Sequence, residues 1–370
     1  MNKPDYSPQM NRKGKEDIIA QMAWEQYSKD NDAEAFFENV SYIAFPLGFR
    51  LPYNKALVFH KTKRDKEASE QIDLAVRNFE GLLRNNRCAN CKTACGNYLY
   101  RLGSIINHTL NNKEKTAEYN IKLSQYDPMT SDYDGKDYVD VFSFRRYNQY
   151  SIQDLINNEI TVVFPSEMND PFDSVYNVFR EIDNLESICY EKDDALGYHD
   201  IFNYYRVRSF VKGNSIWNLK NILMWSHYTD GHKGFCIKYR LSKHFINTPT
   251  DNGYLCMNDI RYTSQPIPVN CDVNGVTAFM TKNSRWQYEH EVRLISYDVS
   301  TESPYFAHPL DKDSFVSAIY FGYKCDEKVK DTIYNMVKSK YPKCSFWQMG
   351  IDKSKNVYEL KASVYKEGMQ

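Results

Sequence analysis

The chain has 370 residues, with 47 Lys and Arg against 48 Asp and Glu, and 15% of its residues are aromatic. This balance excludes a strong sequence-independent attraction to nucleic acid or to an anionic membrane. The aromatic content supplies a sizeable core, so one large or two ordinary folded domains are expected. There is no apolar run of about 18 residues and the first residues are polar, so we expect a cytoplasmic protein without a membrane span or signal peptide.

Residues 1–128 are predicted to form an all-helical domain of helical hairpins. Apolar residues recur at helical spacing in four segments, 16–27, 32–44, 66–86 and 88–110. The apolar face predicted for the first helix consists of Ile18, Ile19, Met22, Ala23 and Tyr27. No self-similar period is strong enough to name a repeat.

Residues 129–370 are predicted to form a second, mixed domain of strands and helices. The boundary between the domains is the polar stretch 124–138, which contains a Pro, a Gly and several acidic residues. Strands are expected at 141–147, 160–164, 221–228, 234–240, 291–297, 317–322 and 357–365, and helices at 151–158 and 326–341. Without regular β-α-β alternation the fold class is α+β, and without a G-x-G-x-x-G or Walker loop a dinucleotide-binding Rossmann fold is disfavoured.

The cluster C-A-N-C-K-T-A-C holds Cys88, Cys91 and Cys95. Gaps of three and four residues are typical of zinc or iron–sulfur loops, but they also lie along one face of a helix. That face continues to Leu102, and no second C-x-x-C pair supplies a fourth ligand. We interpret the cluster as a buried helix face of free thiols, with a metal site or a redox-active thiol as the alternatives.

The segment N-D-P-F-D, residues 169–173, has the chemistry of a turn. Asp170 or Asp173 would lie at the rim of a pocket if the turn is functional. The alternative is a strand-to-loop corner in which Phe172 fills the core.

Residues 221–240 are predicted to form a hairpin around the turn Asp230-Gly231. Its first strand, Ile222 to Tyr228, is dense in polar side chains, including Ser226 and His227. Adjacent strand residues point to opposite faces, so Ser226 and His227 do not suit a catalytic dyad.

Two further segments place charge within strand-like sequence. Arg145 and Arg146 end the first predicted strand just before a helix, where an arginine is suited to hold phosphate or carboxylate. In R-W-Q-Y-E-H-E-V-R-L-I-S-Y, residues 285–297, Glu289 and Glu291 are predicted to share one strand face with Arg293.

Taken in order over residues 138–325, these segments resemble a large bacterial domain-of-unknown-function family. Its signatures are an N-D-P-F-D/E turn, a W-S-H-Y-x-D-x-H-K-G-F block and a W-x-Y-E-x-E-x-R block. Members are often met among defence and abortive-infection genes, so the resemblance implies an anti-phage defence effector or a toxin.

The order Arg, Ser or Tyr, Glu-x-Glu also resembles the ADP-ribosyltransferase superfamily, which consumes NAD as a substrate and needs no metal. The resemblance implies that Glu291 stabilises the ribosyl oxocarbenium ion, that Glu289 orients or deprotonates the acceptor, and that Tyr228 stacks near nicotinamide. It further implies NAD-binding roles for the residues Arg145, Arg146, Ser226, His227, Asn169 and Asp170. The W-S-H-Y segment differs from the S-T-S of the arginine-specific transferases.

Two other functions remain open from the sequence. A metal-dependent nuclease or phosphodiesterase would gather Mg²⁺ with Asp170, Asp173, Glu289 and Glu291, and would hold phosphate with Lys282 or Arg293. A non-catalytic sensor would bind a ligand in the second domain and a protein partner through the helical domain. The acceptor, protein or nucleic acid, is not defined by the sequence.

Overall fold

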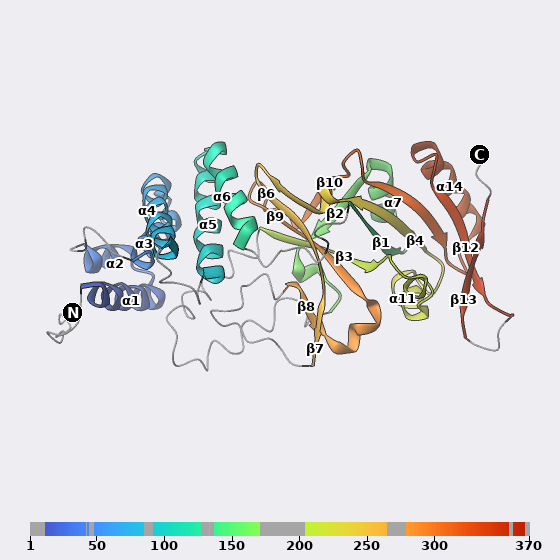
Figure 1. The fold of residues 1–370 in the computed structure, drawn as a ribbon, viewed down its shortest axis with the longest axis horizontal. Helices are drawn as coiled ribbons and strands as arrows, with labels where there is room; N and C mark the ends of the chain where they lie inside the picture. Colours follow the sequence, from blue (N-terminus) through green and yellow to red (C-terminus); the bar gives the residue numbers. More distant parts are fainter. Residues whose placement is uncertain are drawn as a thin grey trace.

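The computed structural model describes residues 12–41, 43, 48–84, 92–126, 133, 137–170, 204–264, 279–354 and 358–366. A helical region comes first and a sheet-rich region follows it (Figure 1). This arrangement confirms the predicted α+β class. Among the described helices, none has both the length and the apolar character needed to cross a bilayer.

Six described helices precede the first described strand. They are α1 (Arg12–Asp30), α2 (Ala33–Val40), α3 (Arg50–Lys61), α4 (Asp65–Arg84), α5 (Lys92–Thr109) and α6 (Lys113–Tyr126). Consecutive helices pack together, with the most extensive pairs being α3 with α4 and α5 with α6. Four of them match predicted segments, and α3 and α6 were not predicted.

The buried face of α1 differs from the predicted one. Met22 is exposed, whereas Trp24 is fully buried together with Ala20 and Tyr27. The indole of Trp24 lies 6.3 Å from the Phe36 ring in an edge-on contact. The helix turns its largest apolar side chain inward, because burying an indole removes more apolar surface from water than burying a thioether.

In the sheet-rich region, the described residues form one large sheet of eleven strands. Its strands are β1 (Tyr138–Arg145), β2 (Glu159–Val163), β3 (Tyr205–Lys212), β4 (Phe235–Ser242), β5 (Asn247–Thr250), β6 (Gly253–Asp259), β9 (Glu291–Asp298), β10 (Tyr305–Pro309), β11 (Phe315–Phe321), β12 (Ser345–Ile351) and β13 (Leu360–Val364). The order is β13-β12-β11-β4-β1-β3-β9-β6-β5, with β2 joining β3 and β10 joining β2. Strands β11 and β12 are parallel, and their described neighbours in this sheet pair in the antiparallel sense. A separate parallel pair consists of β7 (Arg261–Thr263) and β8 (Thr281–Asn283).

The sheet divides along one edge of β3. Strand β1 pairs with β3 at Val141 with Lys212 and at Phe142 with Val211. Strand β2 pairs with the same edge at Val163 with Val207. Between these points no described strand pairs with this edge of β3, since the rest of β1 continues alongside β4 instead. Residues 208–210 therefore border a divergence between β1 and β2.

The segment 222–228 is a helix, α11 (Ile222–Tyr228), so the predicted strand and hairpin were wrong. Asn221 caps the helix, because its side chain accepts a hydrogen bond from the Leu223 backbone N–H at 3.0 Å. Ile222 and Leu223 are exposed while Met224 and Trp225 are buried, which gives the grouped pattern of a helix rather than alternation. Further short helical segments are η1 (Pro165–Glu167), α10 (Ile216–Leu219) and α12 (Lys243–Ile246).

The segment 285–297 is likewise not a single strand. Residues Ser284–Glu289 form a 3₁₀ helix, η3, and His290 has a left-handed backbone with φ of 45°. Strand β9 begins only at Glu291. The prediction that Glu289 and Glu291 share one strand face was therefore wrong.

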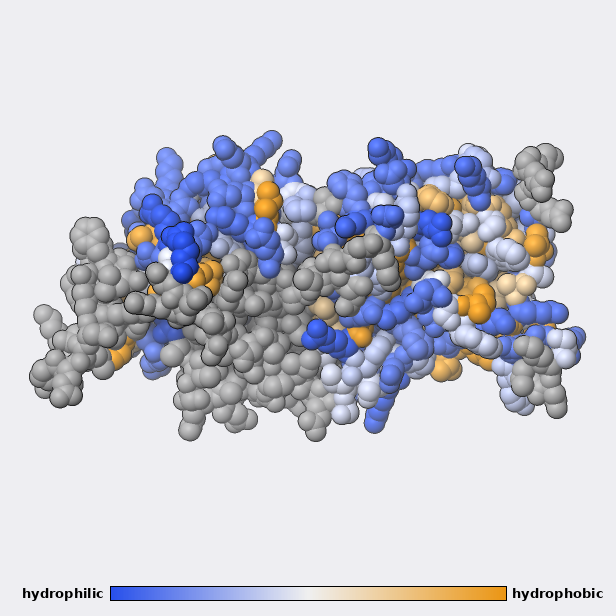
Figure 2. All heavy atoms as spheres, viewed as in Figure 1, coloured by the Kyte–Doolittle hydropathy of each residue, from blue (hydrophilic) through white to orange (hydrophobic). Residues whose placement is uncertain are grey.

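The apolar core runs continuously from the helices into the sheet. One cluster joins Trp24, Phe79 and Leu123 of the helical region to Tyr205 and Tyr297 of β3 and β9. A second cluster involves α7 (Gln149–Asn157) and α14 (Glu327–Lys340), which lie on the same side of the sheet in Figure 1. On the face shown in Figure 2, the described surface is mostly hydrophilic, and small apolar groups are more frequent toward the C-terminal end.

Gly234 should be intolerant of any side chain. A Cβ at this position would lie 2.1 Å from the carbonyl oxygen of Arg145, which is a backbone atom at the end of β1. We expect Gly234→Ala to destabilise the protein by about 1–3 kcal/mol, measured by chemical denaturation. Gly350→Ala is the control, since no described atom lies within 4 Å of the place that its Cβ would take. Equal stability of the two variants would contradict the close approach.

Candidate functional site

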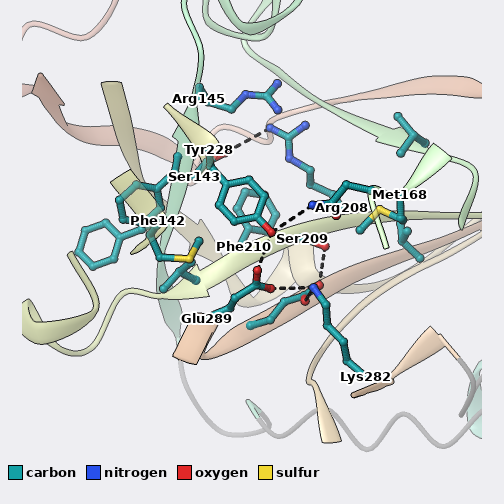
Figure 3. A pocket seen from close by; sticks show the side chains of 17 residues that line it. Phe142, Ser143, Arg145, Met168, Arg208, Ser209, Phe210, Tyr228, Lys282 and Glu289 are labelled. Atoms are coloured by element: carbon teal, nitrogen blue, oxygen red, sulfur yellow. Dashed lines mark hydrogen bonds and ion pairs between the residues drawn. The ribbon is translucent and has the colours of Figure 1, made fainter. Parts of the chain in front are cut away.

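A cleft of about 250 Å³ lies where β1 and β2 diverge from β3. Its walls come mainly from four parts of the fold: β1, β3, helix α11 and the segment from β8 to the start of β9. Figure 3 shows Arg145 and Arg208 at one end of the cleft, Glu289 and Lys282 at the other, and Tyr228 between them. The apolar part of the wall consists of Phe142, Phe144, Val163, Met168, Val207, Phe210, Val211 and Met224.

Glu291 is a buried carboxylate held by several donors. Its Oε1 accepts hydrogen bonds from the Ser209 hydroxyl and from Nε and Nη2 of Arg293, at 2.9 and 2.7 Å for the arginine. Its Oε2 accepts from Nζ of Lys282 at 2.8 Å. Burial alone would raise the pKa of Glu291, but the two cations and the hydrogen bonds from Lys282 and Ser209 outweigh it and lower the pKa to about 2.

Glu289 lies on the other side of Lys282. Its Oε2 accepts from Nζ of Lys282 at 2.7 Å, and its Oε1 accepts from the Tyr228 hydroxyl at 2.5 Å. Burial raises the pKa of Glu289 despite the nearby ammonium group and the Tyr228 hydrogen bond, and the charge of Glu291 adds to the rise. Asn169 completes this chain of contacts by donating to the Tyr228 oxygen at 3.4 Å.

The opposite end of the cleft carries two guanidinium groups and one carboxylate. Asp154 of α7 accepts from Nη2 of Arg145 at 3.0 Å and from Nη2 of Arg208 at 3.5 Å. Arg208 also reaches across the divergence, donating to the Ser143 hydroxyl of β1 and to the Thr161 carbonyl of β2, each at 3.3 Å. Two positive charges against one negative charge leave this end of the cleft cationic.

Arg145 remains charged at neutral pH. Burial and the neighbouring charge of Arg208 lower the pKa of its guanidinium to about 10, although Asp154 opposes the shift. Its Nε is buried and has no hydrogen-bond partner among the described residues. An anionic ligand group in the cleft would supply the missing negative charge.

The structure brings together five of the predicted site residues: Arg145, Asn169, Tyr228, Glu289 and Glu291 all line the cleft. The sequence did not distinguish Arg145 from its neighbour Arg146. In the structure, Arg146 is exposed and does not line the cleft.

Three other predicted residues do not line the cleft. Ser226 contacts Nε2 of His232 at 3.3 Å, and His227 contacts the Tyr288 hydroxyl at 3.1 Å. Both lie on helix α11 but outside the cleft lining, to which this helix contributes Met224 and Tyr228. Asp170 is buried next to the lining residue Asn169 but is not part of the wall.

Four residues that shape the cleft were not predicted as site residues: Lys282 (considered only as a phosphate ligand), Arg208, Ser209 and Asp154. Arg208 and Ser209 lie on β3, whose sequence Y-R-V-R-S-F-V-K alternates two arginines with β-branched and aromatic residues. That alternation was a usable strand signal. No strand was predicted over these residues.

The predicted metal ligands are only partly within the described structure. Among the described residues, no group of three or more His, Cys, Asp or Glu side chains is arranged to hold a metal ion. Asp173, Cys88, Cys91 and the side chain of Cys95 lie outside the described residues.

Comparisons with known proteins give one match. The sequence model of a family described as "Protein of unknown function (DUF2971)" matches residues 224–294. This range includes the W-S-H-Y and W-x-Y-E-x-E-x-R segments and three cleft-lining regions, around Tyr228, Lys282 and Glu289 to Glu291. It supports the predicted resemblance to a domain-of-unknown-function family. No curated protein and no solved structure matches the chain.

The low pKa of Glu291 predicts a specific acid sensitivity. Glu291 has a pKa of about 2 in the folded protein, which lies below the value of about 4.3 in an unfolded chain. Its carboxylate therefore contributes its full stability above about pH 4.3, and this contribution is lost as the pH falls toward 2. The shift corresponds to a contribution on the order of 3 kcal/mol at neutral pH. Denaturation of the wild type and Glu291→Gln between pH 7 and pH 2 measures it.

His308 also titrates in this pH range, and comparing the wild type with Glu291→Gln cancels its effect on stability. Burial lowers the pKa of His308 to about 4, so its protonation destabilises both proteins between about pH 6.5 and pH 4. We expect the stability of wild type and variant to converge as the pH falls below about 4. A constant difference down to pH 2 would show that Glu291 does not titrate as expected.

Proposed function

We propose that the protein is an NAD-consuming enzyme of the ADP-ribosyltransferase kind, acting as a transferase or as a glycohydrolase. The observation that supports this most directly is the convergence of Arg145 and Arg208 with Glu289 and Glu291 on one cleft. The arginines suit the anionic pyrophosphate of a dinucleotide, and the carboxylate oxygens suit its cationic nicotinamide ribose. The ADP-ribosyltransferase-like fold is part of the proposal.

In the proposed reaction, the bond between ribose C1′ and the nicotinamide nitrogen breaks and both electrons leave with neutral nicotinamide. Positive charge develops on the ribose ring. The carboxylate of Glu291 is fixed by Arg293 and Lys282, and a low pKa keeps it ionised, so it stabilises that charge without reorganising.

Glu289 is suited to the second half of the reaction. The acceptor, a water molecule or a macromolecular nucleophile, forms the new bond to C1′ and gives up a proton. Burial raises the pKa of Glu289 toward the range of an effective general base. Its Oε1 faces Tyr228, whose hydroxyl orients the carboxylate toward the cleft.

The size and lining of the cleft limit which part of the substrate enters it. A volume of about 250 Å³ lies just below the ~300–1,000 Å³ range of pockets that enclose a whole drug-sized ligand. The cleft therefore holds the nicotinamide ribose and the adjoining phosphate, and the adenosine lies beyond it. Phe142, Phe144, Met224 and Tyr228 provide an apolar wall for a planar ring.

Two observations favour this function over the alternatives. The ammonium group of Lys282 lies between the carboxylates of Glu289 and Glu291, at the position where a nuclease would hold its metal. The paired acids and arginines converge on one cleft, whereas a non-catalytic sensor would be expected to have a pocket without such a convergent acid–arginine pair. By the family resemblance, the proposed biological setting is bacterial anti-phage defence or a toxin system.

Glu289→Gln is the sharpest test of the proposed chemistry. The substitution keeps the shape of the side chain, and Lys282 retains Glu291 as its partner. We expect release of nicotinamide from NAD, or transfer of labelled ADP-ribose to lysate protein or nucleic acid, to fall by at least about 100-fold. The thermal melting of this variant should stay close to wild type.

Glu167→Gln is the matched control, because Glu167 is an exposed acid next to the lining residue Met168. Its activity should equal that of the wild type. A Glu289→Gln variant with full activity would overturn the role of this carboxylate. A wild-type protein that neither binds NAD nor modifies a macromolecule, with or without a phage trigger, would overturn the proposed function.

Arg145 and Arg146 should differ sharply in NAD binding. Arg145→Ala removes a charge from the cationic end of the cleft, so we expect the Kd for NAD to rise roughly 10-fold or more. Arg146→Ala alters an exposed neighbour that lies outside the lining and should leave the Kd unchanged. Isothermal titration measures both. Equal effects would place the phosphate elsewhere.

A further inference from the structure

Lys282 is a charged side chain in an unusual position. It comes from β8, is almost fully buried, and places its Nζ 2.7 Å from Glu289 and 2.8 Å from Glu291 (Figure 3). The ring of Trp286 lies 5.1 Å from the ammonium group and covers it further. Burying an ammonium group in this way is costly unless its partners are fixed.

The two carboxylates need a cation between them. Nζ of Lys282 contacts both acids at once, whereas the guanidinium of Arg293 compensates Glu291 from the side of Oε1. Without the lysine, two like charges would share a buried site, and one of them would tend to take up a proton. Burial by itself lowers the pKa of Lys282, but the two carboxylates raise it above the ordinary value, so the ammonium form persists.

The bridging geometry is the one that a divalent cation adopts between two acids. Carboxylate oxygens at 2.7 and 2.8 Å from one centre lie slightly farther out than the ~2.3–2.6 Å of calcium ligands. The ammonium group thus occupies the volume of a metal ion but carries half of its charge. It leaves the pair with a net negative charge before Arg293 is counted.

We propose that Lys282 is a built-in counter-ion that takes the place of a divalent cation between Glu289 and Glu291 and holds both carboxylates ionised and oriented in the cleft. It is a positioning residue, acting on substrate through the two acids. The consequence for catalysis, activity without divalent cations, rests on the proposed function. The consequence for stability and ion binding does not.

A double-substitution cycle tests the charge balance. Lys282→Met keeps the length of the apolar stem but removes the cation between two buried carboxylates, so we expect the Tm to fall by roughly 5–15 °C. Adding Glu289→Gln removes the excess charge and should recover a substantial part of that loss. Lys233→Met, at an exposed lysine with a 3.5 Å surface contact to Asp230, should leave the Tm unchanged.

The outcome of the cycle is decisive in either direction. A double variant more stable than Lys282→Met supports the counter-ion role, even if the single variant is too unstable to purify. A double variant that is no more stable than Lys282→Met overturns it, because the lysine would then act only by filling space.

Ion binding provides a second measurement that uses no NAD. Lys282→Ser opens the volume between the acids and adds a small oxygen ligand, so this variant should bind Mn²⁺ at one site that the wild type lacks. Binding is measured as the loss of the electron paramagnetic resonance signal of free Mn²⁺. Adding Glu289→Gln should abolish that site. Equal Mn²⁺ binding by wild type and Lys282→Ser, or no binding by a folded Lys282→Ser, would overturn the proposal.

The two proposals fail separately. If wild type does not cleave NAD but the substitution cycle and the Mn²⁺ titration behave as expected, the proposed reaction is wrong and the counter-ion stands. If wild type cleaves NAD only with added Mg²⁺ or Mn²⁺, the reaction stands and the counter-ion proposal is overturned.

Discussion

The carboxylate of Glu291 is buried at the start of a central strand, and its charge must be compensated there. Arg293, two residues along β9, supplies one cation, and Ser209 on the neighbouring β3 supplies a hydroxyl. Lys282 arrives from β8 to supply the second cation. Removing either cation leaves charge poorly compensated in a low-dielectric surrounding. This requirement explains why three separate segments meet at one wall of the cleft.

The same logic operates at the opposite end, where the sheet divides. Arg208 donates to β1 and β2 at once, so it supplies hydrogen bonds across a divergence where strand pairing is interrupted. Asp154 neutralises only one of the two arginines it contacts. The divergence of β1 from β3 thus creates both the space and the unbalanced positive charge. This unbalanced positive charge attracts an anionic ligand group to that end of the cleft before any contact forms.

The sequence identified the acids and Arg145 because those side chains lie in strongly apolar or aromatic segments, where charge is conspicuous. It could not show that Lys282 approaches Glu291, since β8 and β9 do not pair and the connection runs through η3. It also misassigned residues 222–228, where aromatic side chains favour a strand but Asn221 begins a helix. Capping is a local signal that outweighed propensity here. The predicted α+β class was nevertheless confirmed, because it depends on the helices and strands taken together and not on the assignment of any single segment.

Strands β3 and β9 connect the cleft to the helical region. Tyr205 and Tyr297, near one end of this antiparallel pair, belong to the core that includes the helices, while Ser209 and Glu291 lie toward the other end. The ladder between them is continuous from residue 205 to residue 211. The helices therefore bury the end of the pair that the cleft does not use. Fixing that end fixes the register on which the contact between Ser209 and Glu291 depends, so the helical region supports the cleft geometry without contributing a lining residue among those described.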